Sequence, residues 1–416
     1  MTDSVSITCC RSCDSAGLAT ILDLGSTPLA NALVKPEDQG EPEVRYPLKL
    51  VFCPRCTLVQ ITETVRPEIL FREYLYFSSF SDTMVKHAAE LAARLISERG
   101  LGADSLVVEV ASNDGYLLQF YGRSGVPVLG VEPATNIAKA AVERGIPTIC
   151  EFFGETLANR LVAEGKRADV IHANNVLAHV ADLNGFVRGF QSLLKNNGVV
   201  VVEAPYVVDM IEHSEFDTIY HEHLCYFSLT ALNQLFQRNR LTIVKVERLP
   251  IHGGTLRIVA MRADATALVK TDRSTVDRLL REESEYGADQ MGFYLDFSEK
   301  VQHVRDDLLE LLRRLKAEQK SIAVYGASAK GSTLLNYFGI GRDTLGFVVD
   351  RSSVKQGLLT PGTHLEIWSP QRLLDAMPDY VLLLTWNFAD EILEQQAEYR
   401  RRGGRFIIPV PQVKIV

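Results

Sequence analysis

Two pairs of cysteines near the start of the chain constrain its fold more than any other feature. They form the motifs Cys10-Arg-Ser-Cys13 and Cys53-Pro-Arg-Cys56. Each C-x-x-C pair can wrap two thiolates around one metal ion, and four thiolates complete a closed tetrahedral shell typical of structural zinc. Two disulfides or a redox pair are the alternative. The segment between the pairs is longer than in a short zinc ribbon, so we expect it to carry structure of its own.

The cellular compartment bears on the choice between zinc and disulfides. The stretch MTDSVSITCC lacks the charged start and apolar core of a signal peptide, and no apolar run approaches the ~20 residues that span a bilayer. We therefore expect a cytoplasmic protein without a membrane partner, where disulfides are rare and zinc is favoured. Cys9 is expected to be a spectator beside the first motif. Cys150 and Cys225 are expected to be small buried apolar residues.

Composition excludes several broad classes. The chain has 416 residues, of which 46% are hydrophobic and 23% charged, and these values are ordinary for a globular protein of more than one domain. Lys and Arg number 44 and Asp and Glu number 52, giving a net charge of −8. This balance argues against a dedicated nucleic-acid binder, although it leaves room for a local basic pocket that holds a phosphate.

From residue 101 onward the pattern alternates between strands and helices. The expected buried strands are Leu106–Val110, Pro127–Val131, Asp169–Ala173 and Val199–Glu203. Alternation of this kind predicts a parallel sheet that binds its ligand at the carboxyl ends of the strands. The fold class is therefore α/β.

Acidic residues end the first two of these strands. The first strand runs into Glu109-Val-Ala-Ser-Asn-Asp-Gly115, and the second ends at Glu132. An acid, a tight turn and a second acid suit a ligand with an adenosine, because the second carboxylate can accept hydrogen bonds from the ribose hydroxyls. NAD and S-adenosylmethionine both satisfy this logic. The first strand is not followed by G-x-G-x-x-G, which weakens NAD, and only the last glycine of the usual methyltransferase loop is present, as Gly115.

The cofactor site is expected to include this loop and the ends of neighbouring strands. Asn175 follows the third strand where the sheet opens, so it can contact the ligand or act as a helix cap. The expected cofactor-binding residues are Glu109, Ala111, Asn113, Gly115, Glu132, Asn174 and Asn175.

The loop Glu109–Gly115 resembles the variant loop of the sugar C-methyltransferase family, S-adenosylmethionine enzymes that act on nucleotide-linked 4-keto sugars. Further matching segments follow in the same order over nearly the whole chain: Tyr74-Leu-Tyr76-Phe-Ser-Ser79, Tyr220-His-Glu-His223, His252-Gly-Gly254 and Tyr325-Gly-Ala-Ser-Ala-Lys330. The resemblance implies a small N-terminal zinc-binding domain, a central S-adenosylmethionine-dependent methyltransferase domain of Rossmann-like fold, and a C-terminal Rossmann-like α/β domain.

The segment Tyr220-His-Glu-His223 places four titratable side chains in a row. On a strand, Tyr220 and Glu222 would share one face, and His221 and His223 the other. A hydrogen-bonded polar patch, or a metal held by His221 and His223, are the alternatives. Methylation of a carbon beside a ketone needs a base for the α-proton and a donor for the keto oxygen, and histidine has a suitable pKa for the base.

The resemblance assigns the family's Tyr-x-Glu-His motif to Tyr220, Glu222 and His223, the expected catalytic residues. We expect His223 to be the base, Glu222 to orient it or bind the substrate, and Tyr220 to donate to the keto oxygen. The division of these roles stays open. His179 is expected to pack or to lie on a helix surface.

Two further segments are expected near the substrate. Tyr74 and Tyr76 can reach it from a domain junction, or they pack as ordinary aromatic residues. His252 lies in a tight turn between the strands Thr242–Val246 and Thr255–Ala260, where it can line the pocket.

The C-terminal part contains a second strand–turn–helix unit. A charged helical bridge leads to the strand Ser321–Tyr325, which runs into Gly326-Ala-Ser-Ala-Lys-Gly331. A helix N-terminus with small residues and one lysine suits a diphosphate, bound by Ser328 and Lys330. The alternative is a Rossmann-like scaffold without a ligand. The resemblance implies that this domain holds part of a nucleotide sugar.

The rest of this part follows the same pattern. The further expected strands are Thr344–Asp350, Asp379–Leu384 and Arg405–Pro409. Trp386 and Asn387 follow the second of these strands and are expected to border the same cleft as Ser328 and Lys330.

The sequence therefore predicts a three-part enzyme, with a zinc-binding domain at 1–70, a methyltransferase domain at 71–265 and a helical bridge with a nucleotide-sugar-binding domain at 266–416. The expected reaction is C-methylation beside the 4-keto group of a dTDP-linked deoxysugar by a monomer or weak homo-oligomer. The alternatives are methylation of another enolisable natural-product intermediate, an NAD-dependent sugar-modifying enzyme, and a non-catalytic, zinc-organised binding protein.

Overall fold

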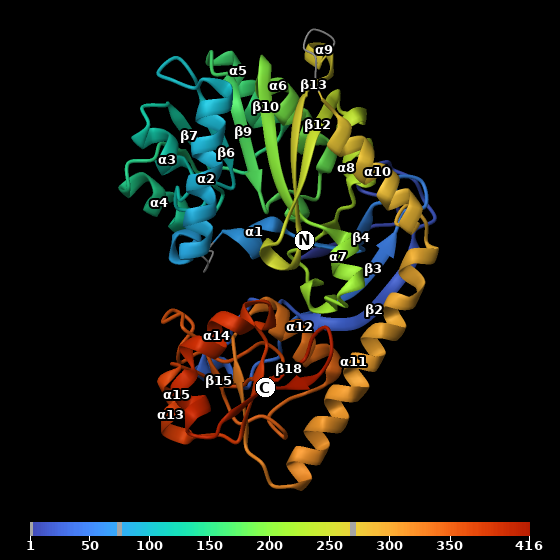
Figure 1. The fold of residues 1–416 in the computed structure, drawn as a ribbon, viewed down its shortest axis with the longest axis vertical. Helices are drawn as coiled ribbons and strands as arrows, with labels where there is room; N and C mark the ends of the chain where they lie inside the picture. Colours follow the sequence, from blue (N-terminus) through green and yellow to red (C-terminus); the bar gives the residue numbers. More distant parts are fainter. Residues whose placement is uncertain (1–2, 73–76, 267–271) are drawn as a thin grey trace.

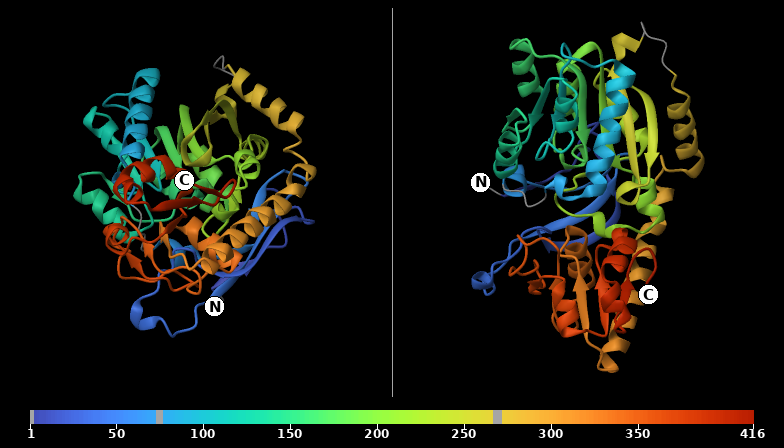
Figure 2. Two further views of the ribbon diagram at one scale, coloured as in Figure 1. Left: turned by 60° about the horizontal axis from the view of Figure 1, so that its bottom comes forward. Right: turned by 60° about the vertical axis from the view of Figure 1, so that its left-hand side comes forward.

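Three sheet-containing bodies are stacked along the long axis of the molecule in the computed structural model (Figure 1). The structure describes residues 3–72, 77–266 and 272–416. A small N-terminal sheet lies between a seven-stranded sheet and a C-terminal sheet, and a long helix, α11 (Gly292–Ala317), runs along the outside of the stack (Figures 1 and 2). The division at residues 70 and 265 remains a prediction.

The N-terminal sheet is completed by a strand from much later in the chain. Its order is β11-β4-β3-β2, with β2 at Ala19–Pro28, β3 at Arg45–Phe52, β4 at Val59–Ile61 and β11 at Cys225–Tyr226. Two short strands, β1 (Ser4–Ser6) and β5 (Glu63–Val65), pair with each other beside it. The segment between the two cysteine pairs thus carries its own structure, as the sequence predicts.

The middle of the chain forms a seven-stranded sheet of order β12-β13-β10-β9-β6-β7-β8. The strands are β6 (Val107–Val110), β7 (Val128–Val131), β8 (Thr148–Ile149), β9 (Ala168–Asn174), β10 (Leu194–Pro205), β12 (Leu241–Leu249) and β13 (Thr255–Arg262). Strands β6 to β10 are parallel, and β13 runs antiparallel between β10 and β12. The strand order reverses between β6 and β9, so this is the switch point where such sheets bind ligands.

Helices cover both faces of this sheet. Val107, Val199 and Val201 belong to one apolar cluster, whereas Val108, Val200 and Val202 belong to another, as alternation along doubly buried strands requires. The helices on the first face are α2 (Asp82–Arg99), α3 (Leu118–Arg123) and α4 (Thr135–Glu143), and those on the second are α5 (Glu155–Ala163), α6 (Leu183–Leu193), α8 (Leu229–Arg238) and α10 (Ser274–Tyr286). Three shorter helices are α1 (Pro67–Phe71), α7 (Val207–Glu212) and α9 (Ala263–Thr266).

The C-terminal sheet has the order β16-β15-β14-β17-β18-β19. Its strands are β14 (Ile322–Tyr325), β15 (Val348–Val349), β16 (Ile367–Trp368), β17 (Tyr380–Leu383), β18 (Arg405–Ile408) and β19 (Lys414–Ile415), and its helices are α12 (Ala329–Phe338), α13 (Gln371–Ala376), α14 (Ala389–Gln395) and α15 (Ala397–Arg401). Counted in chain order, the strands run 3-2-1-4-5-6, the dinucleotide-binding order of the Rossmann fold. Its switch point lies between β14 and β17.

Two local expectations are wrong: Cys150, expected to be buried, is exposed, and one C-terminal strand is shorter than expected. The strand expected over Thr344–Asp350 is reduced to Val348–Val349, because the carbonyl of Gly341 accepts the N–H groups of Thr344 and Leu345 and closes a turn there. The segment Tyr220–His223, for which the sequence leaves strand, loop and helix open, forms a turn, in which the His223 N–H bonds to the Tyr220 carbonyl at 2.9 Å. Side-chain alternation therefore does not apply to it. None of the helices in the described ranges is long and apolar enough to cross a membrane.

Candidate functional site

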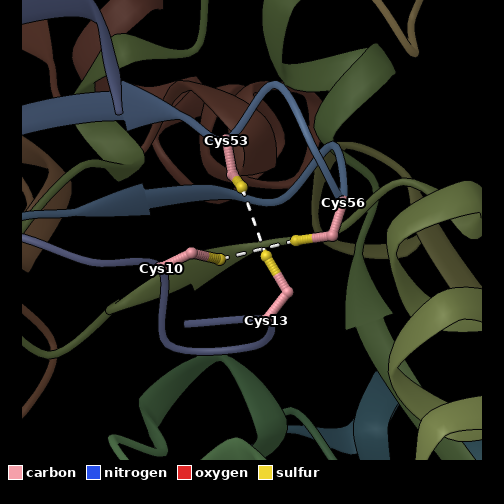
Figure 3. A group of neighbouring side chains, drawn as sticks. All are labelled: Cys10, Cys13, Cys53 and Cys56. Carbon is pink, nitrogen blue, oxygen red and sulfur yellow. Dashed lines mark hydrogen bonds between the residues drawn. The ribbon is translucent and has the colours of Figure 1, made fainter. Parts of the chain in front are cut away.

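The four cysteines of the two C-x-x-C motifs converge on one point (Figure 3). All four sulfur atoms lie within 4.8 Å of one another, with Cys10 Sγ and Cys56 Sγ 3.4 Å apart and Cys13 Sγ and Cys53 Sγ 3.6 Å apart. Tetrahedral zinc with Zn–S bonds of about 2.3 Å places its sulfur ligands about 3.8 Å apart. The sulfurs are much too far apart for disulfides, whose S–S bond is about 2.05 Å. The donor set fits a closed structural zinc shell.

Each cysteine pair sits in the same kind of turn. The residue after the second cysteine has a positive φ in both cases, 56° at Asp14 and 60° at Thr57. The Asp14 N–H bonds to the Cys10 carbonyl, and the Thr57 N–H bonds to the Cys53 carbonyl. These two turns aim the thiols inward, and the side-chain amide of Gln60 on β4 donates to Cys10 Sγ at 3.3 Å.

The loop after β6 carries the expected cofactor-binding residues Ala111, Asn113 and Gly115. Ala111 and Asn113 have φ of +55° and +48°, so two non-glycine residues take the left-handed conformation that usual loops give to glycine. Gly115 has φ +79°, and a Cβ there would meet Ile146 Cγ1 at 2.7 Å, which explains why only the last glycine is kept. The sequence predicts these loop residues but not their backbone conformation.

Glu132, at the end of β7, reaches across to this loop. Its Oε2 accepts the Asn113 N–H at 3.0 Å and its Oε1 accepts the Ala134 N–H at 2.8 Å. Burial raises the pKa of this carboxyl, while the two N–H groups lower it. The carboxylate lies beside the loop, as a residue that accepts hydrogen bonds from a ribose should.

Buried polar atoms without a partner in the described residues surround the loop. They are Glu109 Oε2, Ser112 Oγ, Asp114 Oδ1 and Asn174 Oδ1. Burial and the nearby charges of Glu132 and Asp114 raise the pKa of Glu109 well above its usual range. Unsatisfied acceptors and crowded carboxyls suit a polar ligand with positive charge, such as the sulfonium and ammonium groups of S-adenosylmethionine.

Asn175 stands at the switch point with φ +53°, and its N–H bonds to the Glu203 carbonyl at 2.8 Å. The residue that caps the following short helix is Val176, so the helix-cap alternative for Asn175 is wrong. Asn174 and Asn175 therefore lie at the carboxyl end of β9, facing the same edge of the sheet as the loop after β6.

A short segment before α2 closes over the cofactor loop. The Ser78 N–H bonds to Asn113 Oδ1 at 2.8 Å, and the Ser79 hydroxyl donates to Asp114. Arg144 pairs with the same Asp114 carboxylate at 2.5 Å. The sequence analysis includes Ser78 and Ser79 in a family motif but assigns them no role. Tyr74 and Tyr76 lie outside the described residues.

The centre of the polar cluster is a hydrogen-bonded pair. The Tyr220 hydroxyl and His223 Nε2 are 2.9 Å apart, and His223 Nδ1 lies 3.0 Å from the Thr218 carbonyl. A carbonyl can only accept, so Nδ1 carries the proton and Nε2 of the neutral ring accepts from Tyr220. The basic nitrogen of His223 thus faces Tyr220. The Thr218 carbonyl orients the ring, which is one of the two roles expected of Glu222.

Glu222 is hydrogen-bonded to the N-terminal part and senses a charge of the C-terminal part. Its Oε1 accepts from Asn31 Nδ2 at 2.6 Å. Burial raises the pKa of Glu222 from 4.5 to about 7, and the Asn31 hydrogen bond and the Lys355 charge act against that rise. Its carboxyl is therefore poised between its two protonation states near neutral pH. Neither Asn31 nor Lys355 carries a sequence signal.

The two other histidines of this region have packing roles. His221 is buried, with Nε2 3.1 Å from the Pro47 carbonyl. His179 Nδ1 bonds to the Glu222 carbonyl at 2.7 Å, its ring packs edge-on against His223, and burial lowers its pKa to about 4. Within the described ranges, the four cysteines are the only cluster of three or more possible metal ligands, so a metal on His221 and His223 gains no support.

Steric constraints explain why two glycines follow His252. Gly253 and Gly254 have φ of +88° and +127°, and a Cβ would meet Glu215 Oε1 at 2.5 Å or Asp209 Oδ2 at 2.0 Å. The backbone of the turn therefore packs closely against two buried carboxyls, those of Glu215 and Asp209. Beside them lies a pocket whose lining includes Tyr206, Met210, Glu215, Thr218, Tyr226 and both glycines. The side chain of His252 lies outside the described part of the structure.

The C-terminal switch point also brings its predicted residues together. The Ser328 hydroxyl caps α12 by accepting the Gly331 N–H at 3.1 Å. Lys330 Nζ lies 4.7 Å from the centre of the Trp386 ring and 3.4 Å from Glu215 Oε2. Asn387 follows Trp386 in a short helix at the end of β17. Of these residues, Lys330 and Trp386 contact the middle part, at Glu215 and Asp217.

This second unit repeats the carboxylate arrangement of the first. Asp350, at the end of β15, accepts the Ala327 N–H at 2.8 Å, as Glu132 accepts that of Asn113. Lys355 Nζ donates to the Ala327 carbonyl at 2.7 Å. Lys355 is a junction residue that the sequence analysis misses; it is a cation shortly after the acid that ends the second strand.

These features define a methyltransferase of the S-adenosylmethionine-dependent class that carries a structural zinc centre. Comparison with known families agrees along the chain. A zinc binding domain model matches residues 10–71, a methyltransferase domain model matches residues 84–246, and a C-methyltransferase C-terminal domain model matches residues 250–411.

The chain is 36% identical over 407 residues to the C-methyltransferase NovU of Streptomyces niveus, covering 98% of this chain and 96% of NovU. It therefore belongs to this family of C-methyltransferases, as the motifs predict. A ubiquinone biosynthesis O-methyltransferase of Bartonella quintana is 25% identical over 154 residues, which cover 33% of this chain and 60% of that enzyme.

Among solved structures, magnesium protoporphyrin IX methyltransferase from Synechocystis PCC 6803, with bound SAM, aligns with a TM-score of 0.34 and 13% identity. The alignment covers 43% of this chain and 79% of that one. A similarity of this size supports no conclusion about the reaction.

We predict that Cys53→Ser removes most of the bound zinc and lowers the melting temperature, because three thiolates no longer close the shell. Metal analysis and thermal unfolding measure both effects. The matched control is Cys9→Ser, which changes an exposed cysteine beside the motif. Full zinc content and full stability in Cys53→Ser would contradict the assignment.

We predict that Glu132→Ala weakens binding of S-adenosylhomocysteine roughly 10- to 150-fold, the range for losing a hydrogen bond to a charged group. Glu132→Gln keeps an acceptor oxygen and should lose less. Calorimetry measures the affinity, with Glu143→Ala on the exposed side of α4 as control. Unchanged affinity in Glu132→Ala would rule out this placement of the cofactor.

We predict a pH dependence of stability that comes from Glu222. Its pKa in the folded protein is about 7, above the usual 4.5, so its contribution is complete below about 4.5 and is lost as pH rises through 7. Glu222→Gln has no proton to release. Between pH 5 and pH 8, the free energy of unfolding should fall by roughly 2 kcal/mol more in wild type than in the variant. Parallel urea-unfolding profiles across that range would contradict this.

Proposed function

We propose that the protein transfers a methyl group to the carbon beside the 4-keto group of a dTDP-linked deoxysugar through an enolate. The observation that carries the proposal is the Tyr220–His223 pair, with its basic nitrogen and its donor 2.9 Å apart. The similarity to NovU supports the reaction class, and the acceptor is our inference. The proposal places the protein in deoxysugar biosynthesis.

His223 acts as the base in this proposal. The Thr218 carbonyl holds the proton on Nδ1, so Nε2 keeps its lone pair for the α-proton of the sugar. When the C–H bond breaks, its electron pair enters the enolate and Nε2 becomes protonated. Tyr220 turns its O–H from Nε2 to the enolate oxygen, where negative charge develops.

The cofactor-binding residues supply the second half of the reaction. Glu109, Asn113, Glu132, Asn174 and Asn175 would hold S-adenosylmethionine at the carboxyl ends of β6, β7 and β9. When bound, this cofactor supplies an electrophilic methyl group, which the enolate carbon takes while the bond to sulfur breaks.

Glu222 binds the sugar in this scheme. Its pKa of about 7 lets the carboxyl donate or accept a hydrogen bond near neutral pH. Asn31 of the N-terminal part binds it and the charge of Lys355 of the C-terminal part acts on it, so a substrate that contacts Glu222 would lie where the three parts meet.

The nucleotide end of the substrate is assigned to the C-terminal switch point. The predicted substrate-binding residues Tyr74, Tyr76, His252, Ser328, Lys330, Trp386 and Asn387 remain proposals. The N-terminus of α12 and the cations Lys330 and Lys355 favour a diphosphate there. In the structure Lys330 pairs with Glu215, so a diphosphate has to compete with that carboxylate for the lysine.

The location and state of the protein complete the proposal. A reducing cytoplasm would keep the four thiolates available for zinc. A monomer or weak homo-oligomer that binds neither nucleic acid nor membrane remains the expected state. Methylation of another enolisable metabolite is the alternative outcome of the assay below.

We predict that His223→Asn keeps cofactor and substrate binding but loses about 10²–10⁴-fold in turnover, the usual worth of a general base. Turnover is measured by mass spectrometry of a dTDP-4-keto deoxysugar incubated with S-adenosylmethionine. A sharper readout is exchange of the α-proton in deuterated water without the methyl donor.

The control is His303→Asn, an exposed histidine on α11. Exchange at the wild-type rate in His223→Asn would rule out His223 and move the assignment to Glu222 or His221. Wild-type enzyme that methylates no nucleotide sugar, but does methylate another ketone, would overturn the acceptor and keep the base.

A further inference from the structure

The C-terminal part holds the segment Glu215–Ile219 of the middle part by three separate side chains. Lys330 Nζ lies 3.4 Å from Glu215 Oε2, and the Trp386 indole N–H donates to Asp217 Oδ2 at 2.7 Å. The Thr333 hydroxyl donates to the Ile219 carbonyl at 3.2 Å. Alternate residues of the segment are thus hydrogen-bonded by the N-terminal half of α12 and by Trp386, which begins the short helix after β17.

The same segment is packed and buried. Phe216 is fully buried and stacks on Phe338 of α12, with ring centres 4.9 Å apart. Asp217 is also fully buried, and burial raises its pKa. A carboxyl in such a place is costly unless it is hydrogen-bonded, so the Trp386 N–H contributes directly to where the segment sits.

The segment in turn orients the proposed base. The carbonyl of Thr218 accepts a hydrogen bond from His223 Nδ1 at 3.0 Å. Thr218 lies between Asp217 and Ile219, the two residues that are hydrogen-bonded by Trp386 and Thr333. The Tyr226 hydroxyl donates to the same carbonyl at 3.3 Å. Any shift of Asp217 moves this carbonyl, and with it the ring whose Nε2 faces Tyr220.

The geometry points to Trp386 as a positioning residue: through Asp217 and the Thr218 carbonyl, the C-terminal part fixes the tautomer and direction of His223. This inference rests on the proposed role of His223 as the base. It replaces the substrate-binding role proposed above for Trp386, because the indole N–H is already donated to Asp217. It also gives the C-terminal part a role in the chemical step, beyond holding the nucleotide.

The experiment removes the N–H and keeps the ring. Trp386→Phe is compared with Trp368→Phe, which changes the only other tryptophan of the chain, on β16. We expect Trp386→Phe to bind zinc and S-adenosylhomocysteine as wild type does. Its KM for the nucleotide sugar should change less than about twofold, while kcat and the α-proton exchange rate fall roughly 10- to 100-fold. Trp368→Phe should match wild type.

A double-mutant cycle tests the path through the carboxyl. Asp217→Asn keeps an acceptor for Trp386 and should lose little, whereas Asp217→Ala should lose as much kcat as Trp386→Phe. The double variant Trp386→Phe/Asp217→Ala should be no slower than either single variant, because the pair acts as a unit. Additive losses would overturn a path through this pair.

The remaining outcomes separate this inference from the proposed function. A raised KM for the nucleotide sugar with unchanged kcat in Trp386→Phe would make Trp386 a substrate-binding residue and overturn the positioning role. Wild-type kcat in Trp386→Phe together with an inactive His223→Asn would also overturn it, while the base assignment stands. Full turnover in His223→Asn would instead refute the base assignment.

Discussion

The convergence of four thiols at one point is the constraint on which the rest of the molecule depends. The apolar residues of the N-terminal sheet share one core cluster with the middle part, and a closed metal shell would add to the stability of the sheet. Gln60 on β4 links this centre to the middle part, since its amide donates to Cys10 and its backbone pairs with Cys225 of β11. β11 follows the polar cluster directly along the chain. The zinc centre is therefore linked to the strand that directly follows the turn containing Tyr220 and His223.

Contacts from three parts of the chain give the polar cluster its chemistry. Asn31 comes from the N-terminal part, Lys355 from the C-terminal part, and both act on Glu222. Burial raises the pKa of this carboxyl to about 7, while the Asn31 hydrogen bond and the Lys355 charge act in the opposite direction. The titration of the site is thus a property of the assembled molecule. A substrate that reaches this junction meets groups whose protonation already depends on all three parts.

Much of the fold could be predicted from the sequence because its signals are local. The spacing of Cys10, Cys13, Cys53 and Cys56 specifies four ligands, and apolar runs ending in acids specify strands of a parallel sheet. The contacts that orient the site could not be predicted in this way. The Thr218 carbonyl carries no sequence signal, and Asn31 approaches Glu222 across 191 positions of the chain. The polar cluster forms a turn, where strand alternation gives no information on the directions of the side chains. Periodicity reports on regular elements, whereas sites are built from turns where distant elements meet.

The cofactor loop shows how a chain can depart from a glycine-rich pattern and keep its geometry. Ala111 and Asn113 adopt a left-handed backbone that costs about 1–2 kcal/mol for each residue with a Cβ. Hydrogen bonds made in this conformation stabilise it: the Asn113 N–H bonds to Glu132, and the Asn113 side-chain oxygen accepts from the Ser78 N–H. A glycine would reach the same backbone without strain but offers no side-chain oxygen to the segment before α2. Asparagine at this position thus trades conformational ease for a hydrogen bond to Ser78, which adds to the bond that Ser79 makes with Asp114 of the same loop.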